Sequence, residues 1–497
     1  MCPLSGSLTL RARSEKEGGS NLKVGVIGLG YVGLVTSACL AEWGHSVIGV
    51  ETNESRLDAL KQGRVPFFEP GLTDMVARHA AAGQLEFSAS GSTAVAGADI
   101  VVVAVGTHDG NGGWQTETML SCLSEVVPYM ADDSVLVVRS TLPPDFIRQL
   151  PRLLRSLREQ AGLEPISALV NPEFTREGAA LIDFLEAERV IFGILDDPDG
   201  HGQARLTALY ARSTAPILTM SAIDAAFAKL GSNLFLATKI SFANELATLC
   251  DAYGAQVDQV VAGMSYDARI GGRFLRAGVG FGGSCLPNQV TMTVKSATLA
   301  GIPSPLLAAV DEINHRQRTD FVARIREMIG GSLEGKRVAL LGLTFKPETD
   351  DLRDAPALEI ARHLINGGAT VVAYDPMESA RRRSAELVPG LEVVTSAFEA
   401  VADVDAIGLV TEWTEIVRLD WSAVRALVRN PVLVDGRAAL SPDAMTAAGF
   451  DYAAFGRGVR SHEVAETPLP IGRSPSRLQP ISVDGGSREP MQRVSIE

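Results

Sequence analysis

Cys285 is the residue whose type and position could do the most distinctive chemistry. It ends the glycine-rich run Gly280-Phe281-Gly282-Gly283-Ser284-Cys285. A thiolate held on a loop can trap an aldehyde as a hemithioacetal, and loss of a hydride then leaves a thioester. An alcohol could therefore reach the acid level on one protein. The alternative is a small buried thiol, which is the commonest fate of a free cysteine.

A second motif, Gly28-Leu29-Gly30-Tyr31-Val32-Gly33, lies between an expected strand and an expected helix. In this context the three glycines predict a dinucleotide site. Gly28 permits a tight turn, Gly30 lets the backbone approach the pyrophosphate, and Gly33 lets the helix pack closely on the strand. The helix N-terminus favours the anionic diphosphate. The alternative is a glycine turn with a structural role only.

Glu51 ends the next expected strand, 23 residues after Gly28. A carboxylate at this position accepts hydrogen bonds from ribose hydroxyls and repels a 2′-phosphate. The motif therefore predicts NAD as the cofactor rather than NADP, although Arg56 nearby weakens the repulsion.

Lys229 and Asn233 are spaced i, i+4 on an expected long helix and so share one face. Directed into a cleft, the pair could hold a substrate hydroxyl and stabilise its developing alkoxide. The alternative is a solvated lysine on the outer face of the helix, because lysine is mostly exposed.

Two carboxylates, Glu173 and Glu177, lie four residues apart in the segment that follows another expected strand. They are candidates for acid/base work, although each could instead cap a helix or pair with Arg176. Thr141 follows the strand that ends at Val138 and could hydrogen-bond a water molecule or the nicotinamide amide.

Composition and charge limit the partners. The net charge of -14 argues against nucleic acid or an anionic membrane as the main partner, but it allows a local basic pocket for a phosphorylated substrate. Five scattered cysteines predict neither a disulfide framework nor structural zinc, so we expect no metal. No apolar run is long enough to span a bilayer, and the N-terminus lacks the apolar core of a signal peptide. We therefore expect a cytoplasmic protein.

The remaining pattern predicts an α/β protein with two Rossmann-like doubly wound domains, joined by a long central helix and a helical middle domain. The expected helix spans 221–254, with Ser221 as its cap, Gly254 at its end and an apolar stripe formed by Ile223, Phe227, Leu230 and Leu234. That stripe could form a dimer core or pack within the chain. The expected segments are a disordered arm (1–22), an NAD-binding domain (23–215), a helical middle (216–329), a second Rossmann-like domain (330–462) and a disordered tail (463–497). The expected strands of the first domain are Lys23–Ile27, Ser46–Val50, Ile100–Val105, Val135–Val138, Ser167–Val170 and Val190–Gly193.

Several segments in order along the chain resemble the UDP-glucose/GDP-mannose dehydrogenase family. They are GLGYVG (28–33), VPFFEPGL (65–72), STLPP (140–144), NPEFTREG (171–178), KLGSN (229–233), ARIGGRFLRAGVGFGGSCLP (268–287) and GLTFKPETDDLRDAP (342–356). The resemblance covers about 23–440. It implies oxidation of the primary alcohol of a nucleotide sugar to a uronic acid, with two NAD and a thioester intermediate. It also implies a homodimer formed through the central helix.

The resemblance also implies roles for residues by position. Cys285 is the expected nucleophile, Lys229 and Asn233 hold the sugar 6-hydroxyl and its oxyanion, and Glu173 or Glu177 activates the hydrolytic water with Thr141. The expected nucleotide-sugar contacts are Glu173, Phe174, Lys229, Asn233, Arg269 (in the partner subunit), Phe274, Arg276, Gly282, Lys346 and Arg437. The expected NAD contacts are Gly28, Gly30, Tyr31, Val32, Gly33, Glu51, Arg56, Thr107, Thr141, Glu177 and Arg353.

Two departures from the family pattern leave alternatives open. The family follows its cysteine with a Lys-Asp pair, and Asn288 and Gln289 stand at these positions here. A glutamine cannot accept a proton as an aspartate does. The segment after Val105 is also unusual, since His108 replaces the family's proline. The alternatives are an altered or non-catalytic member that binds nucleotide sugar, and a two-electron hydroxyacid-type dehydrogenase.

Overall fold

Short runs of β-branched residues build an eight-stranded sheet in the N-terminal part of the chain, in the order β3-β2-β1-β4-β5-β6-β7-β8. The computed structural model describes residues 21–109 and 113–462. The strands are β1 (Lys23–Ile27), β2 (Ser46–Val50), β3 (Leu85–Ser88), β4 (Ile100–Val103), β5 (Val135–Val138), β6 (Ser167–Val170), β7 (Val190–Asp196) and β8 (Ile217–Ser221). The helices are α1 (Tyr31–Glu42), α2 (Glu54–Lys61), α3 (Leu72–Ala81), α4 (Gly91–Val95), α5 (Glu117–Val126), α6 (Pro144–Gln160), α7 (Ala180–Leu185) and α8 (His201–Leu209), with a 3₁₀ turn η1 (Val127–Tyr129). Separate apolar clusters cover the two faces of this sheet.

The C-terminal part forms a second sheet of seven strands in the order β11-β10-β9-β12-β13-β14-β15. Its strands are β9 (Arg337–Leu341), β10 (Thr370–Tyr374), β11 (Leu391–Val393), β12 (Ala406–Leu409), β13 (Val432–Asp435), β14 (Asp451–Ala454) and β15 (Gly458–Arg460). Its helices are α13 (Pro356–Asn366), α14 (Glu378–Leu387), α15 (Ala397–Ala400), α16 (Thr414–Val417), α17 (Trp421–Leu427) and α18 (Pro442–Ala447). The predicted fold class, two Rossmann-like α/β sheets with helices between them, is confirmed.

The continuous apolar strands of the first domain predict a parallel sheet covered on both faces, and this prediction is wrong in part, because neither sheet is wholly parallel. β7 runs antiparallel to β6, and β15 runs antiparallel to β14. A parallel neighbour needs a crossover that returns the chain to the opposite edge of the sheet. The connection from β6 to β7 contains only the six-residue helix α7 and stays at the carboxyl edge of the sheet, so β7 runs back. β4 also ends at Val103 rather than Val105, and Leu22, expected in the arm, is buried.

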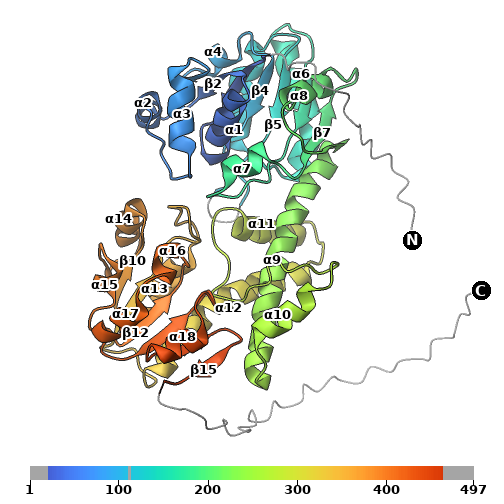
Figure 1. Cartoon of the computed structure of the whole chain (residues 1–497). Helices are drawn as coiled ribbons and strands as arrows, with labels where there is room; N and C mark the ends of the chain where they lie inside the picture. The colour runs from blue at the N-terminus through green and yellow to red at the C-terminus, as the bar shows by residue number, and fades with distance from the viewer. Residues whose placement is uncertain (1–20, 110–112, 463–497) are drawn as a thin grey trace, which may run out of the picture.

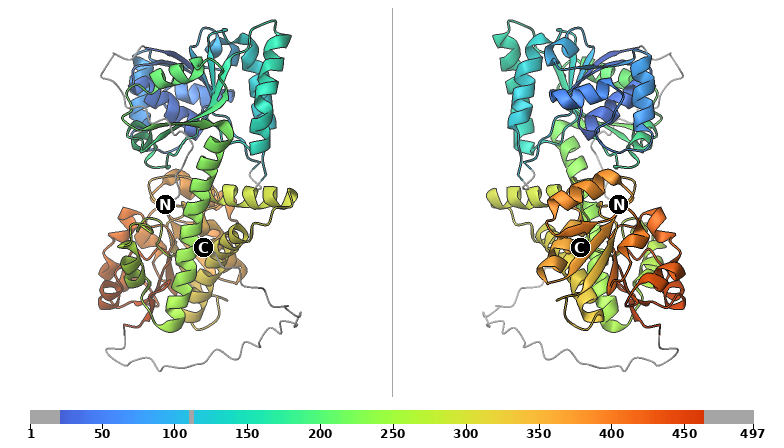
Figure 2. Two further views of the ribbon diagram at one scale, coloured as in Figure 1. Left: turned by 90° about the vertical axis from the view of Figure 1, so that its right-hand side faces the viewer. Right: turned by 90° about the vertical axis from the view of Figure 1, so that its left-hand side faces the viewer.

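A helical middle joins the two sheets, as Figures 1 and 2 show. It contains α9 (Ala222–Tyr253), α10 (Val257–Ser265), α11 (Leu286–Leu299) and α12 (Pro305–Met328). The Ser221 hydroxyl accepts the Asp224 amide N–H at 3.1 Å, and Gly254 ends α9 with a left-handed φ of 71°, so both predicted ends are confirmed. The predicted stripe is only partly buried, because Phe227 is 52% exposed.

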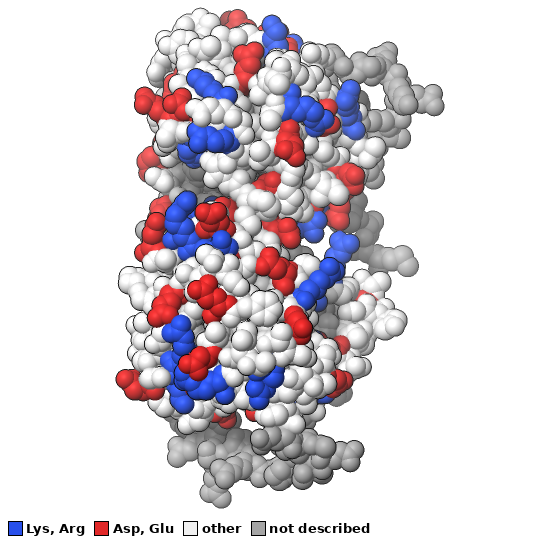
Figure 3. All heavy atoms as spheres, turned by 60° about the vertical axis from the view of Figure 1, so that its left-hand side comes forward, with Lys and Arg blue, Asp and Glu red and all other residues white. Residues whose placement is uncertain are grey.

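The surface and the ends of the chain add little to the fold. Figure 3 shows basic and acidic side chains interspersed over the face that it draws. None of the helices in 21–109 and 113–462 is long and apolar enough to cross a membrane. The predictions for residues 1–20 and 463–497 lie outside the described residues.

Candidate active site

The dinucleotide loop has the geometry that its glycines predict. Gly28 adopts a φ of 91°, which L side chains rarely adopt, and a Cβ on Gly33 would lie 1.8 Å from the Gly28 carbonyl oxygen. A Cβ on Gly30 would meet nothing within 4 Å. The loop is therefore closely packed at Gly33 and open at Gly30. It lies at the N-terminus of α1, and this arrangement fits a dinucleotide diphosphate.

Glu51 is buried at the end of β2 and retains its acceptor role. One oxygen accepts the Asn53 amide N–H at 3.0 Å, and the other lies 3.3 Å from the Arg56 guanidinium. Arg56 also donates to the Leu29 carbonyl at 3.0 Å, so the backbone of the dinucleotide loop holds this arginine in place. Both residues therefore lie beside that loop, as predicted.

The segment 171–178 leaves the carboxyl end of β6, and Asn171 anchors its start. The Asn171 side chain accepts Arg139 and the Tyr210 hydroxyl at 2.6 Å each and donates to the Ile191 carbonyl at 2.9 Å. Arg176 pairs with Asp183 rather than with either glutamate. The two glutamates are therefore held by other partners.

Glu173 forms a buried ion pair with Lys229. The Lys229 ammonium lies 2.9 Å from Glu173 Oε1, and the two side chains are 5% and 10% exposed. Burial raises the pKa of Glu173, but Lys229 and the Thr175 hydroxyl outweigh burial and lower it to about 2. Glu173 is therefore a permanent anion, and Lys229 faces the site rather than solvent. The Phe174 ring lies against the same ammonium, 5.3 Å from its centroid.

The surroundings of Glu177 raise its pKa, whereas those of Glu173 lower it. Burial and the nearby negative charge of Asp351 raise its pKa to about 7, although Arg353 and Lys346 oppose them. Arg353 lies 3.1 Å from Glu177 Oε1, and Lys346 donates to the Glu177 carbonyl. These partners come from the C-terminal part of the chain, so Glu177 lies where the two parts meet. A carboxyl group with a pKa near neutrality can accept a proton from water.

Cys285 is exposed at the N-terminus of α11, whereas Cys39, Cys122 and Cys250 are buried. The alternative of a buried structural thiol is therefore wrong for Cys285. Desolvation by the surrounding groups raises the pKa of the Cys285 thiol, and the charge of Glu173 adds to this increase. Lys229 and the Ser284 hydroxyl, 3.7 Å from Sγ, lower it. The thiol, Lys229 and Glu173 thus form one interacting group.

A cavity of about 290 Å³ is lined in part by the loop that carries Cys285. It is lined by Ile240, Phe274, Arg276, Ala277, Gly278, Gly280, Phe281, Gly282, Leu286, Phe345, Lys346, Glu412 and Arg437. The lining includes Phe274, Arg276, Gly282, Lys346 and Arg437, five of the predicted substrate residues. Gly282 and Leu286 lie on either side of Cys285 in the sequence, so the loop that carries the thiol also contributes to the cavity wall. Three cations and three phenylalanine rings against one carboxylate suit an aromatic base joined to a diphosphate.

The Arg437 side chain is held by backbone carbonyls in the wall of the cavity. Its guanidinium donates to the carbonyls of Gly280, Phe345 and Val410 at 2.9, 3.0 and 2.7 Å. Arg276, in contrast, is exposed and has no ion pair or hydrogen bond within the part of the chain that the structure describes. Arg276 is thus the cation that is free to meet a ligand.

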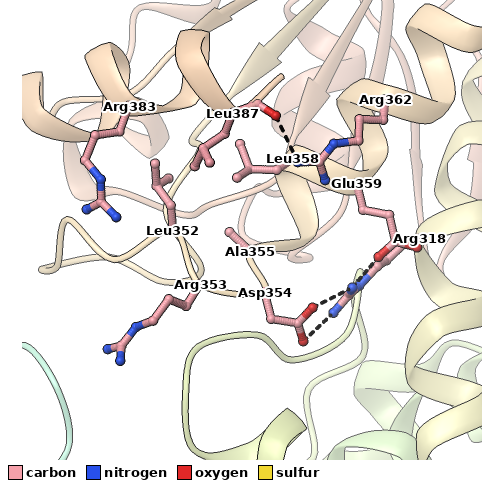
Figure 4. A pocket seen from close by; sticks show the side chains of 10 residues that line it. All are labelled: Arg318, Leu352, Arg353, Asp354, Ala355, Leu358, Glu359, Arg362, Arg383 and Leu387. Carbon is pink, nitrogen blue, oxygen red and sulfur yellow. Dashed lines mark hydrogen bonds and ion pairs between the residues drawn. The ribbon is translucent and has the colours of Figure 1, made fainter. Parts of the chain in front are cut away.

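A larger cavity of about 410 Å³ lies on the C-terminal part, and its lining includes Arg353, the partner of Glu177 (Figure 4). Its lining residues include Leu352, Leu358, Arg362 and Arg383, and no thiol. Figure 4 shows the Arg318 guanidinium paired with Asp354 and Glu359, two further residues of the lining. The smaller cavity is the better candidate for a substrate, because five of the predicted substrate residues line it.

Other predicted residues lie outside the lining of this cavity, and Arg269 is among them, as its predicted role in the partner subunit's site allows. The Arg269 side chain is 90% exposed and pairs with Asp267 outside the cavity. Thr107 lies beside Thr141, whose carbonyl accepts the Thr107 hydroxyl at 2.7 Å. Asn233 is half-buried one turn beyond Lys229 on α9.

Sequence reasoning missed several residues that shape the site. Asp351 adds to the effect of burial in raising the pKa of Glu177, Glu412 adds a carboxylate to the cavity, and Phe281 and Phe345 add aromatic walls. Asp351 and Phe345 lie inside a motif that was singled out, so their position was visible. Their distance from Glu177 and from the thiol depends on packing between the two parts of the chain.

Comparison with known proteins identifies the class. Models of the UDP-glucose/GDP-mannose dehydrogenase family match at 22–214 (NAD binding domain), 224–316 (central domain) and 339–442 (UDP binding domain). The chain belongs to this family and is an NAD-dependent oxidoreductase.

Individual relatives agree with this class. UDP-glucose 6-dehydrogenase of Rhizobium meliloti is 38% identical over 88% of this chain and 100% of its own length. The Pseudomonas aeruginosa UDP-glucose 6-dehydrogenase is 37% identical over 89% and 99%. A UDP-glucose dehydrogenase structure from Pyrobaculum islandicum aligns with a TM-score of 0.78 and 33% identity, covering 86% of this chain and 96% of its own. A UDP-D-ManNAc dehydrogenase structure from Pyrococcus horikoshii, at 23% identity and a TM-score of 0.77, shares the fold.

Proposed function

We propose that the chain oxidises the 6-hydroxyl of a UDP-sugar, with UDP-glucose giving UDP-glucuronate as the favoured reaction. The observation that carries the proposal is the exposed Cys285 thiol, whose pKa the buried Lys229–Glu173 pair influences and whose sequence neighbour Leu286 lines a cavity of cations and aromatic rings. The names of the most similar relatives support UDP-glucose as the substrate.

The proposed division of labour follows from the charges. Bound NAD supplies the acceptor for a hydride in each of two oxidations. Lys229, held by Glu173, stabilises the alkoxide that develops on the substrate, and Asn233 helps to hold its oxygen. The Cys285 sulfur then adds to the aldehyde carbon, and the carbonyl oxygen takes up a proton to give a hemithioacetal.

Glu177 completes the proposed sequence. After the second oxidation the acyl group is a thioester on Cys285. Glu177 takes a proton from a water molecule, the water oxygen bonds to the acyl carbon, and the carbon–sulfur bond breaks to release the acid and the Cys285 thiolate. Glu173 is a poor candidate for this base because its pKa is about 2 and Lys229 occupies it.

A homodimer formed through α9 remains part of the proposal. Phe235, Phe242 and Leu249 are 65%, 47% and 51% exposed and follow one another at seven-residue spacing on that helix. This spacing puts them on one side of the helix, as in helix–helix seams. Four unpaired cysteines among the described residues support the proposed reducing, cytoplasmic compartment.

The test is the yield of NADH per UDP-glucose with purified full-length protein and excess NAD. Two NADH per sugar supports the four-electron reaction. One NADH points to an enzyme that stops early, and none, with UDP-glucose still raising the melting temperature, points to a binding protein. The outcome of one NADH has support from Gln289, because this buried amide stands where the family has an aspartate and cannot accept a proton as an aspartate does. Its Oε1 has no hydrogen-bond partner among the described residues. A thermal-shift comparison of UDP- and GDP-sugars then identifies the sugar and the base.

A further inference from the structure

Glu69 is a buried carboxylate that none of the proposed steps uses. It lies in the turn before α3 and is only 4% exposed. A buried carboxylate is costly unless hydrogen bonds or charges satisfy it. Its partners therefore indicate what the residue does.

Three groups donate to Glu69, and they come from two separate functional segments. Oε2 accepts the Gly178 amide N–H at 2.6 Å, and Oε1 accepts the Ala180 amide N–H at 2.7 Å. The Tyr31 hydroxyl also donates to Oε2. Gly178 directly follows Glu177, whereas Tyr31 is the first residue of α1 and directly follows Gly30, whose backbone faces open space.

The neighbouring residue extends the connection to the C-terminal part. The Phe68 amide N–H donates to Asp350 Oδ1 at 3.1 Å, and the other Asp350 oxygen accepts the Ser379 hydroxyl at 2.9 Å. Residues 68–69 thus contact three segments: the start of α1 after the dinucleotide loop, the loop of Glu177, and Asp350 in the C-terminal part of the chain.

We propose that Glu69 is a positioning residue, which fixes the loop of Glu177 and, through Tyr31, couples the position of that loop to occupancy of the dinucleotide site. The role of Glu177 in this inference rests on the proposed function. The coupling itself rests only on the three hydrogen bonds and on the dinucleotide site. A ligand that orders the backbone at Gly30 and Tyr31 also orders the Tyr31 hydroxyl, and hence the Glu69 carboxylate.

Hydrogen exchange of the peptide that contains Gly178 and Ala180, with and without NAD, tests the coupling without turnover. In the wild type we expect NAD to slow exchange of these amides. Glu69→Gln replaces one acceptor oxygen with a donor, so we expect about tenfold faster exchange at Gly178 or Ala180. Tyr31→Phe keeps the ring packed on Phe67 and keeps the amide acceptors. We expect this variant to bind NAD but to lose the slowing that NAD causes.

Kinetics supply the second measurement. A base displaced by about 1 Å loses roughly 10²-fold in rate, so we expect Glu69→Gln to lower kcat by 10–100-fold, an order-of-magnitude range, with an unchanged KM for UDP-glucose. Tyr374→Phe is the matched control, because it removes a phenol–carboxylate contact of the same kind, to Glu415, in the other sheet. We expect it to change neither exchange nor kcat.

The outcomes separate this inference from the proposed function. Wild-type exchange in Glu69→Gln, or full NAD-dependent slowing in Tyr31→Phe, would overturn the coupling. Absence of NADH production by the wild type would overturn the proposed function, and the exchange rates would still decide on Glu69.

Discussion

Replacing Glu177 with glutamine tests the assignment of the hydrolytic base. The pKa of about 7 for Glu177 means that about one-tenth of the groups are ionised at pH 6 and about nine-tenths at pH 8. If Glu177 activates water, the hydrolytic rate of the wild type rises about tenfold across this range. A positioned general base is worth about 10²–10⁴ in rate, so we expect Glu177→Gln to lose this factor and the pH dependence together.

The assay is a pre-steady-state experiment in which UDP-glucose and NAD are both in excess over the enzyme. In Glu177→Gln we expect a burst of NADH, followed by slow steady-state turnover and accumulation of an acyl-enzyme that intact mass spectrometry detects on Cys285. Glu188→Gln is the control, since Glu188 is a carboxylate of the same connection that is 78% exposed. The reasoning fails if Glu177→Gln turns over at the wild-type rate, or if its pH profile keeps the rise between pH 6 and 8.

Other substitutions test the remaining roles. Cys285→Ser should abolish thioester formation, and a normal yield of two NADH per sugar from this variant would refute the covalent role. Lys229→Ala should lower kcat by about 10²–10³ and should also destabilise the fold, because it leaves Glu173 buried without its partner; kcat and thermal melting measure the two effects. Glu177→Gln should raise the melting temperature relative to wild type above pH 7 but not at pH 5, because a pKa raised in the folded state stabilises the fold at low pH and loses that contribution as pH rises through about 7. Gln289→Asp should raise the pKa of Cys285, measured by the pH dependence of alkylation, because it adds a negative charge near the thiol.

The sequence predicted the parts of the molecule that local patterns encode. The ends of α9 depend on Ser221 and Gly254, and the dinucleotide loop depends on glycines whose roles are local, so both were readable. In the first sheet, β3 was missed because it has four residues and carries charged and polar side chains, and β8 was missed because it directly precedes the predicted helix. The antiparallel β7 was missed because strand direction depends on the path of the connection, which apolar patterning does not encode.

The site divides in the same way. Cys285, Lys229 and the two glutamates were identified from residue type and spacing, and packing then distinguished the glutamates. Glu173 meets Lys229 from α9, whereas Glu177 meets Asp351 from the second sheet. These neighbours are distant in sequence, so the sequence alone left both carboxyl groups as candidates for the base, and the proposal of Glu177 rests on the packing.

The same electrostatics give a reason for the glutamine at position 289. Two carboxylates, Glu173 and Glu177, already raise the pKa of the Cys285 thiol. A third carboxylate at 289 would be buried, because Gln289 is only 3% exposed, and would add to that repulsion. An amide there carries no charge, so it leaves the thiolate easier to form. The proton that an aspartate at 289 would accept must then go to another group, and Glu177 is the carboxyl of this site whose pKa lies near neutrality. Under the proposed function, Glu177 takes the role that the family pattern gives to an aspartate at position 289, and Glu177→Gln tests this assignment.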